Sequence, residues 1–148
     1  MSDLKKLGFN VTFQPLEFNT LIQKTHTSYN YECVLLGNTA SVDPGSGMNV
    51  HKSTGFSHQW FPRQPVPSTD WEARIDHLMD TQMGTLDTAE RKQAFGEVQK
   101  ILAEQQPKIY TVTPYYYAAI RSDIGNARPT PLSLYRVTWN APELYFKK

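Results

Sequence analysis

The chain has 148 residues, of which 39% are hydrophobic and 20% are charged, a composition typical of one globular domain. Lysine and arginine number 15 and aspartate and glutamate number 14, so the net charge of +1 gives no electrostatic basis for binding nucleic acid or an anionic membrane. No apolar stretch approaches the ~20 residues of a membrane span, and the first residues lack the hydrophobic segment of a secretory signal. Taken alone, the sequence therefore predicts a cytoplasmic protein.

The first 37 residues predict a βαβ unit. Residues 3–8 are typical of the last turns of a helix that ends at Gly8. A strand is predicted at 11–16, a helix at 17–27 and a second, continuously apolar strand at 31–37. One face of the helix carries Phe18, Leu21, Ile22 and Thr25. Strand, helix and strand in so few residues indicate parallel strands with a right-handed crossover, and hence an α/β fold.

Cys33 is the only cysteine, which excludes an internal disulfide and a cysteine-based zinc site. It lies in the second predicted strand, where a buried and inert thiol is expected. A catalytic thiolate would need an electropositive, partly exposed setting that this apolar run does not supply.

Residues 38–68 predict a long loop, rich in glycine and proline, without helical or strand periodicity. Long loops inside compact domains are usually functional or disordered. Disordered segments are poor in aromatic residues, whereas this one contains Phe56, Trp60 and Phe61. We therefore expect the loop to be ordered and packed against the rest of the chain.

Two amphipathic helices are predicted next, at 70–83 and from 88 to about 105. The first places Trp71, Ile75, Leu78, Met79 and Gln82 on one stripe, and the second places Phe95, Val98, Ile101 and Leu102 inward. Asp87 and Glu90 have the spacing of a capping box at the start of the second helix. We interpret both stripes as core.

Pro107 ends the second helix, and strands are predicted at 109–113 and 115–121. The tail, residues 125–148, ends in the apolar run Leu144, Tyr145 and Phe146, for which the sequence offers no partner strand. The chain contains no internal repeat.

The sequence gives little evidence for an enzyme. It has no phosphate-binding glycine loop, no nucleophile elbow and no cofactor motif. His51, His58 and Asp43 fall in the long loop, so a metal-assisted hydrolase is one alternative, although their spacing matches no recognised metal-ligand pattern. Asp43 precedes a proline and is more typical of a turn.

The loop begins where the second predicted strand ends. Ligands of open α/β sheets bind outside the carboxyl ends of strands. The residues at that place are Asn38, Thr39, Ala40 and Ser41, which are small or polar and suit the close approach of a polar ligand. A plain structural loop is the competing interpretation.

At this point the chain resembles a known family, the family 5 extracellular solute-binding proteins of oligopeptide, dipeptide and nickel ABC importers. The resemblance rests on the ordered series Leu-Lys-Lys-Leu-Gly-Phe-Asn-Val (4–11), Gln-Pro-Leu-Glu-Phe (14–18), the predicted strand 31–37, Asp43-Pro44, Thr-Ala-Glu-Arg-Lys (88–92), Ile-Leu-Ala-Glu-Gln-Gln-Pro (101–107) and the predicted strand 109–114. It covers nearly the whole chain, and no single motif is decisive.

The resemblance implies the last part of the second lobe of a two-lobed periplasmic binding protein, so that residues 1–148 are one incomplete lobe and residues 125–148 return toward a first lobe. It implies a periplasmic or lipid-anchored extracellular location for the full-length protein, and ABC permease subunits as partners. The ligand contacts would be Asn38, Thr39, Ala40 and Ser41 with the loop aromatics Phe56 and Trp60, and no catalytic residue, metal or cofactor is implied.

One departure from the family concerns the ligand. Peptide binders of this family carry an aspartate a few residues before Asp-Pro that pairs with the ammonium group of the peptide. Here that place reads Thr39-Ala40-Ser41-Val42. Because a buried ammonium without a counter-charge is costly, we expect a neutral or differently charged solute. A second alternative is a free-standing interaction domain that self-associates through its long loop and unpaired tail.

Overall fold

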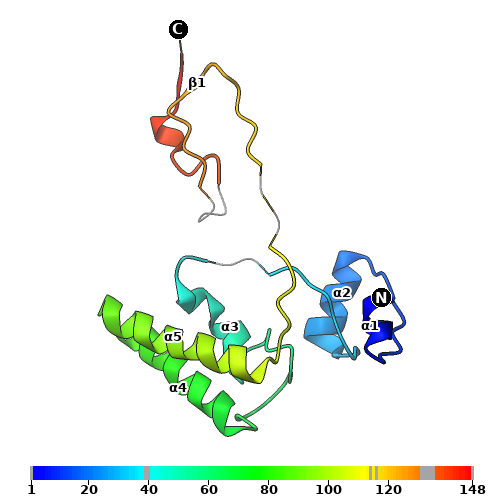
Figure 1. The fold of residues 1–148 in the computed structure, drawn as a ribbon. Coiled ribbons are helices and arrows are strands. Elements are labelled where there is room, and N and C mark those ends of the chain that lie inside the picture. Colours follow the sequence, from blue (N-terminus) through cyan, green and yellow to red (C-terminus); the bar gives the residue numbers. More distant parts are fainter. Residues whose placement is uncertain (1, 39–40, 114, 116, 131–135, 148) are drawn as a thin grey trace. The chain divides into compact units, whose positions relative to one another are not determined.

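The computed structural model describes residues 2–38, 41–113, 115, 117–130 and 136–147, and the chain divides into two compact units, Met1–Leu36 and Gly37–Lys148. The described residues are mostly helical, and their only strand pairing is one two-stranded hairpin (Figure 1). The predicted α/β fold is therefore wrong, because the described residues contain no βαβ unit.

The first unit contains two short helical segments. Helix α1 spans Ser2–Lys6 and is followed by Gly8, whose φ of 89° ends the helical path. Helix α2, Phe18–Gln23, begins after the Glu17 carboxylate, which accepts hydrogen bonds from the backbone N–H groups of Asn19 and Thr20. It continues as one π-helical turn, η1, Lys24–Ser28. The helix predicted at 17–27 is thus confirmed.

The strands predicted on either side of α2 do not form. Residues 11–16 and 31–37 are extended or irregular and pair with no strand among the described residues. Several of their apolar side chains are exposed, among them Phe13 and Leu35, which are 63% and 77% exposed. Cys33 is also exposed, which contradicts the expected buried thiol. These residue types favour strands, but a strand is stable only when a neighbour takes up its backbone hydrogen bonds, and none is provided here.

The second unit is organised around a helical pair (Figure 1). Helix α4, Asp70–Gly84, begins after Thr69, whose side chain caps the backbone N–H of Glu72. Helix α5, Thr88–Gln105, begins after Asp87, whose carboxylate accepts from the N–H groups of Ala89 and Glu90. It ends at Gln106, which adopts the left-handed conformation before Pro107. Both helices agree with the predicted ranges to within one residue.

The core of this unit lies between α4 and α5. Its buried members are Ile75, Leu78 and Met79 of α4 and Ala94, Val98 and Leu102 of α5. Met48, Trp60, Trp71, Phe95 and Ile101 are partly buried and pack against them. The two predicted apolar stripes are confirmed as core. Gln82, which was predicted on the same stripe, is fully buried and bonded to Arg91.

Two short elements precede the pair, the 3-10 turn η2, Pro44–Gly47, and helix α3, Met48–His51. After α5, the strands predicted at 109–113 and 115–121 are not formed in the residues described there, and Val112 is 86% exposed. The cause is the same as in the first unit, because no neighbouring strand edge is available.

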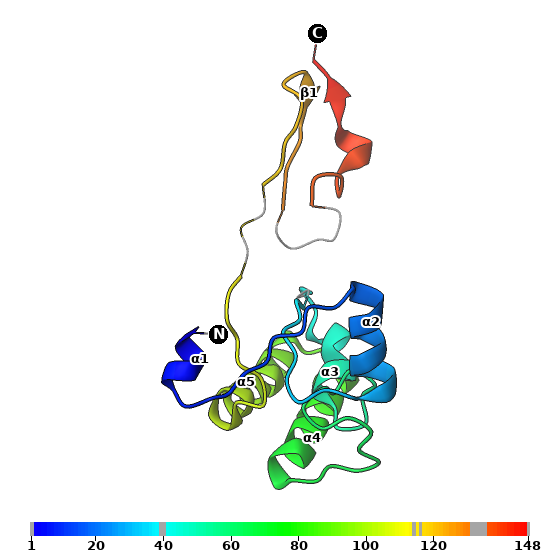
Figure 2. The same ribbon diagram turned by 90° about the vertical axis from the view of Figure 1, so that its right-hand side faces the viewer.

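The chain ends in a small hairpin (Figure 2). Strand β1, Ile124–Gly125, pairs antiparallel with β2, Tyr145–Phe146, in the register Ile124 to Phe146 and Gly125 to Tyr145. The 3-10 turn η3, Ala141–Glu143, lies just before β2. The Tyr145 ring packs closely over Gly125, where a Cβ atom would require the ring to move. The expectation that Tyr145 and Phe146 lack a partner strand is therefore wrong, since a two-residue segment after the predicted strand supplies one.

Candidate functional site

Residues 41–68 of the predicted loop are held against α4 and α5 by several side chains. Ser53 donates from its backbone N–H and its hydroxyl to Asp76 of α4, at 2.7 and 2.6 Å. Lys52 donates to Asp80, one turn further along the same helix, at 2.6 Å. Arg91 of α5 donates to both carboxylate oxygens of Asp43, at 2.8 and 3.0 Å. The expectation of an ordered loop packed on the chain is confirmed.

The strongest attachment is a buried polar cluster centred on Glu72, which is only 2% exposed. One carboxylate oxygen, Oε1, accepts from Gln64 Nε2 at 2.8 Å and from the Trp60 indole N–H at 3.2 Å. The other, Oε2, accepts from the Thr69 hydroxyl at 2.9 Å and lies 3.3 Å from the Ser68 hydroxyl oxygen. We call these residues, with His58, the Glu72 cluster. Both oxygens accept hydrogen bonds within the cluster and the side chain is buried, so the carboxylate stabilises the loop and is not presented to solvent for acid–base chemistry.

His58 occupies the centre of this cluster and is 1% exposed. Its Nδ1 lies 3.2 Å from the Val50 carbonyl oxygen, and its Nε2 lies 3.3 Å from Gln64 Nε2. Burial lowers the pKa of His58 and outweighs the opposing effect of Glu72, so the ring is neutral at pH 7. Its Nε2 also lies 3.3 Å from Glu72 Oε1, which joins the ring to the carboxylate at the centre of the cluster.

The charge of Glu72 is strongly favoured in the folded state. Burial alone raises its pKa, but hydrogen bonds led by those from Gln64 and Thr69 outweigh burial and lower the pKa to about 2. Ser68 completes the arrangement, since its backbone N–H and hydroxyl both donate to Gln64 Oε1, at 2.9 and 2.6 Å. The cluster is thus satisfied throughout, the condition under which buried polar groups rigidify a structure.

The residues predicted to contact a ligand take different environments. Asn38 and Ser41 are exposed, while Thr39 and Ala40 lie outside the described residues. Phe56 is 63% exposed on the loop. Trp60 is partly buried, with its N–H bonded to Glu72, its ring 3.9 Å from that of His58 and the Lys108 ammonium 5.0 Å from its centroid. The structure therefore gives Trp60 a packing role, and the predicted ligand contacts remain predictions.

The three side chains of the hydrolase alternative are engaged separately. Asp43 is bound by Arg91, His58 belongs to the Glu72 cluster, and His51 lies 6.0 Å, ring centre to ring centre, from Phe95. Among the described residues, no three side chains of the metal-binding types come together as a site. The geometry therefore gives that alternative no support.

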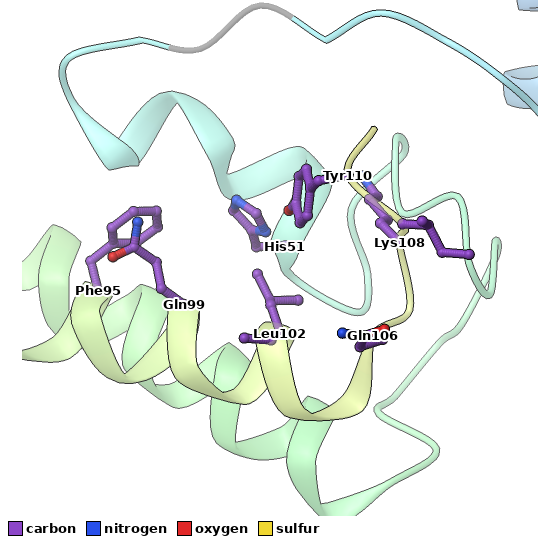
Figure 3. Close-up of a pocket in the computed structure, with 9 residues that line it drawn as sticks. His51, Phe95, Gln99, Leu102, Gln106, Lys108 and Tyr110 are labelled. Carbon is purple, nitrogen blue, oxygen red and sulfur yellow. The ribbon is translucent and has the colours of Figure 1, made fainter. Parts of the chain in front are cut away.

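A separate concave site lies where α3, α5 and the segment after α5 meet (Figure 3). We call it the α3–α5 hollow; it is open on one side and has a volume of about 440 Å³. It is lined by His51, Phe95, Gln99, Leu102, Ala103, Gln106, Lys108, Ile109 and Tyr110. Figure 3 shows the α5 side chains in a row along one wall, with His51 and Tyr110 facing them. Its size is within the range of small-molecule sites.

The surroundings of two basic side chains in this hollow disfavour their charged forms. Burial, and then the nearby charge of Lys108, lower the pKa of His51 to about 4. Burial also lowers the pKa of Lys108. His51 Nδ1 is buried without a hydrogen-bond partner, and Lys108 has no carboxylate within ion-pair distance in the part of the chain that the structure describes. The hollow thus contains polar groups that the chain itself does not satisfy.

The sequence interpretation missed both Glu72 and the hollow. Thr69 and Glu72 have the Thr-x-x-Glu spacing of a capping box, and that signal could have marked Glu72 as a residue that turns toward the loop. For the hollow no local signal existed, because His51 and Lys108 are far apart in sequence and neither belongs to a motif.

Comparison of the chain with protein-family models, with curated proteins and with solved structures gives no match. The resemblance to the family 5 solute-binding proteins therefore stays a prediction from the residues. None of the helices in the described residues is long and apolar enough to cross a membrane.

Proposed function

We propose that this chain supplies one wall of the solute-binding site of an ABC importer of the peptide-type lineage, working with a second body and with permease subunits. The observation that carries the proposal is a loop of nearly thirty residues whose base is held by the Glu72 cluster while Phe56 stays 63% exposed. A loop fixed in this way presents an aromatic side chain without losing conformational entropy when it binds. The ordered series of residues that resembles the family 5 proteins supports the same proposal.

The contacts of Asp43 bear on the class of solute. Its carboxylate accepts from the Gly45 N–H and from Arg91, and these bonds lower its pKa. This acid is therefore already neutralised and is not offered to a ligand. Together with the absence of an acid at residues 39–42, this favours a solute without a free α-ammonium group.

The test is solute uptake in the organism that carries the gene. Deleting the gene should abolish uptake of one class of solute, and the wild-type gene should restore it. Phe56→Ser should restore uptake poorly, whereas Phe61→Ser, a 52% exposed phenylalanine on the same loop, should restore it fully. Peptides with free and with acetylated N-termini should be compared, and the acetylated form is expected to be the better substrate. Unchanged uptake in the deletion strain for peptides, nickel and other solutes would refute the proposal.

Binding by the isolated chain gives an independent check. Because one wall of a cleft makes only part of the contacts, the chain alone should bind no imported solute tightly. Titration calorimetry that detected sub-micromolar binding of such a solute would contradict the idea of a shared site.

Self-association is a second candidate, favoured by the apolar residues that follow α5. Val112 and Tyr117 are 86% and 93% exposed, and the segment around them forms no strand pairing in the described residues. Such a segment can pair with another copy of itself. Sedimentation at several concentrations decides the matter, because a strict monomer excludes this role.

A further inference from the structure

The α3–α5 hollow combines apolar walls with basic groups that lack a partner among the described residues. Phe95 and Leu102 of α5 form one wall, and Tyr110 faces them across the opening (Figure 3). All of these side chains belong to the second unit, so the hollow does not depend on how the two units are placed.

Lys108 is the charged group of the hollow. Its ammonium nitrogen lies 5.0 Å from the centroid of the Trp60 ring, and no carboxylate of the described residues pairs with it. A cation over an aromatic ring is stabilised by much less than a cation paired with an anion. A partly buried ammonium without a counter-ion therefore favours an anion that enters the hollow.

His51 adds the second polar group. Its Nδ1 is buried without a hydrogen-bond partner, while its other edge packs over Gly47, where a Cβ atom would lie 3.1 Å from Nε2. A buried imidazole nitrogen without a hydrogen-bond partner destabilises the folded chain. A ligand that brings a hydrogen-bonding group to this nitrogen would remove that cost.

We propose that the α3–α5 hollow binds a small monocarboxylate with an apolar body, its carboxylate near Lys108 and His51 and its apolar part against Phe95 and Leu102. One cation matches a single negative charge, whereas a doubly charged phosphate would meet only one cationic side chain, Lys108, among the residues that line the hollow. The apolar walls disfavour a small inorganic anion, which would remain better hydrated in water. This binding is separate from the proposed importer function, because it uses neither Phe56 nor the residues at 38–41.

The test is a titration of the full chain with phenylpropionate, followed by backbone amide chemical shifts, with phenylpropionamide as the matched neutral ligand. The acid should bind with a Kd on the order of 1 mM and perturb residues of the hollow, and the amide should bind at least about tenfold more weakly. Equal affinity for acid and amide, or shifts confined to other residues, would overturn the proposal. This comparison requires no variant and so does not depend on the folding of one.

Three variants then locate the site. Lys108→Met keeps the length of the side chain and should weaken binding of the acid about tenfold, while Lys100→Met, an exposed lysine of α5, should leave it unchanged. Ala103→Phe, on the exposed side of α5 at the rim of the hollow, should block the site for both ligands. Wild-type affinity in Lys108→Met would refute the assignment.

The pKa of His51 provides a second measurement, because it should change on ligand binding only if the ligand lies beside this residue. The pKa should rise from about 4 when phenylpropionate binds, because a nearby anion favours the imidazolium. An unchanged pKa in saturating phenylpropionate would place the ligand elsewhere.

Discussion

Glu72→Gln is the sharpest test of how the loop is held. The substitution keeps the shape of the side chain but replaces one acceptor oxygen by a donor, which then faces donors of the Glu72 cluster. The uncharged amide also approximates the protonated carboxyl group. In the folded chain, the pKa of Glu72 falls from its ordinary value of 4.5 to about 2, which corresponds to about 3 kcal/mol in favour of the charged form. We therefore expect the variant to lose about 3 kcal/mol of stability at pH 7, or roughly 6–12 °C in Tm.

The assay is urea unfolding at several pH values, followed by circular dichroism. Because the folded pKa lies below the unfolded one, the contribution of Glu72 is complete above about pH 4.5 and is lost as the pH falls toward 2. The gap between wild type and variant should shrink over that range. Glu97→Gln is the control, since it breaks only the surface ion pair with Arg74 and should cost less than about 1 kcal/mol. Equal losses in the two variants, or a gap independent of pH, would refute the reasoning.

Two further predictions concern the cap of α5 and the titration of His51. Asp87→Ala should destabilise the chain by about 1 kcal/mol through loss of the α5 cap, as measured by thermal unfolding. Glu90→Ala should destabilise it less, because the Asp87 N–H is bonded to the Thr85 hydroxyl and not to Glu90. An equal loss of stability in the two variants would contradict this assignment of the cap. Wild-type stability should also fall between pH 6.5 and about 4, because the unfolded chain takes up a proton at His51 that the folded chain does not. In His51→Gln this part of the change of stability with pH should be absent. His77→Gln is the control for the loss of a histidine. An unaltered pH dependence in His51→Gln would rule out His51 as its source.

The helices of this chain could be predicted because the information for them is local. The apolar stripes of α4 and α5 and the cap at Asp87 lie within one or two turns of the residues they organise. The strands could not be predicted in the same way. Residues 31–37 and 109–113 have the composition of strands, yet a strand depends on hydrogen bonds from a neighbour that local sequence does not identify.

In the candidate site, too, the features set by local sequence could be predicted and those set by packing could not. Order in the loop was predictable from its aromatic residues, but the partner of Trp60 was not, because Glu72 lies on a helix where a charged residue is normally exposed. His51 and Lys108 meet only because α5 places the residues after its end beside α3. Their effect on each other depends on that packing and not on any motif.

The residues after α5 belong both to the α3–α5 hollow and to the segment considered for self-association. Ile109 and Tyr110 line the rim of the α3–α5 hollow and also begin the extended segment that has no strand partner in the described residues. A strand from a second body that paired with this segment would fix the backbone that positions Lys108 and Tyr110. Ligand binding in the hollow and strand pairing would then share one structural element. Linkage requires that each change the affinity of the other by the same factor, so a carboxylate that strengthens pairing must itself bind more tightly to the paired chain.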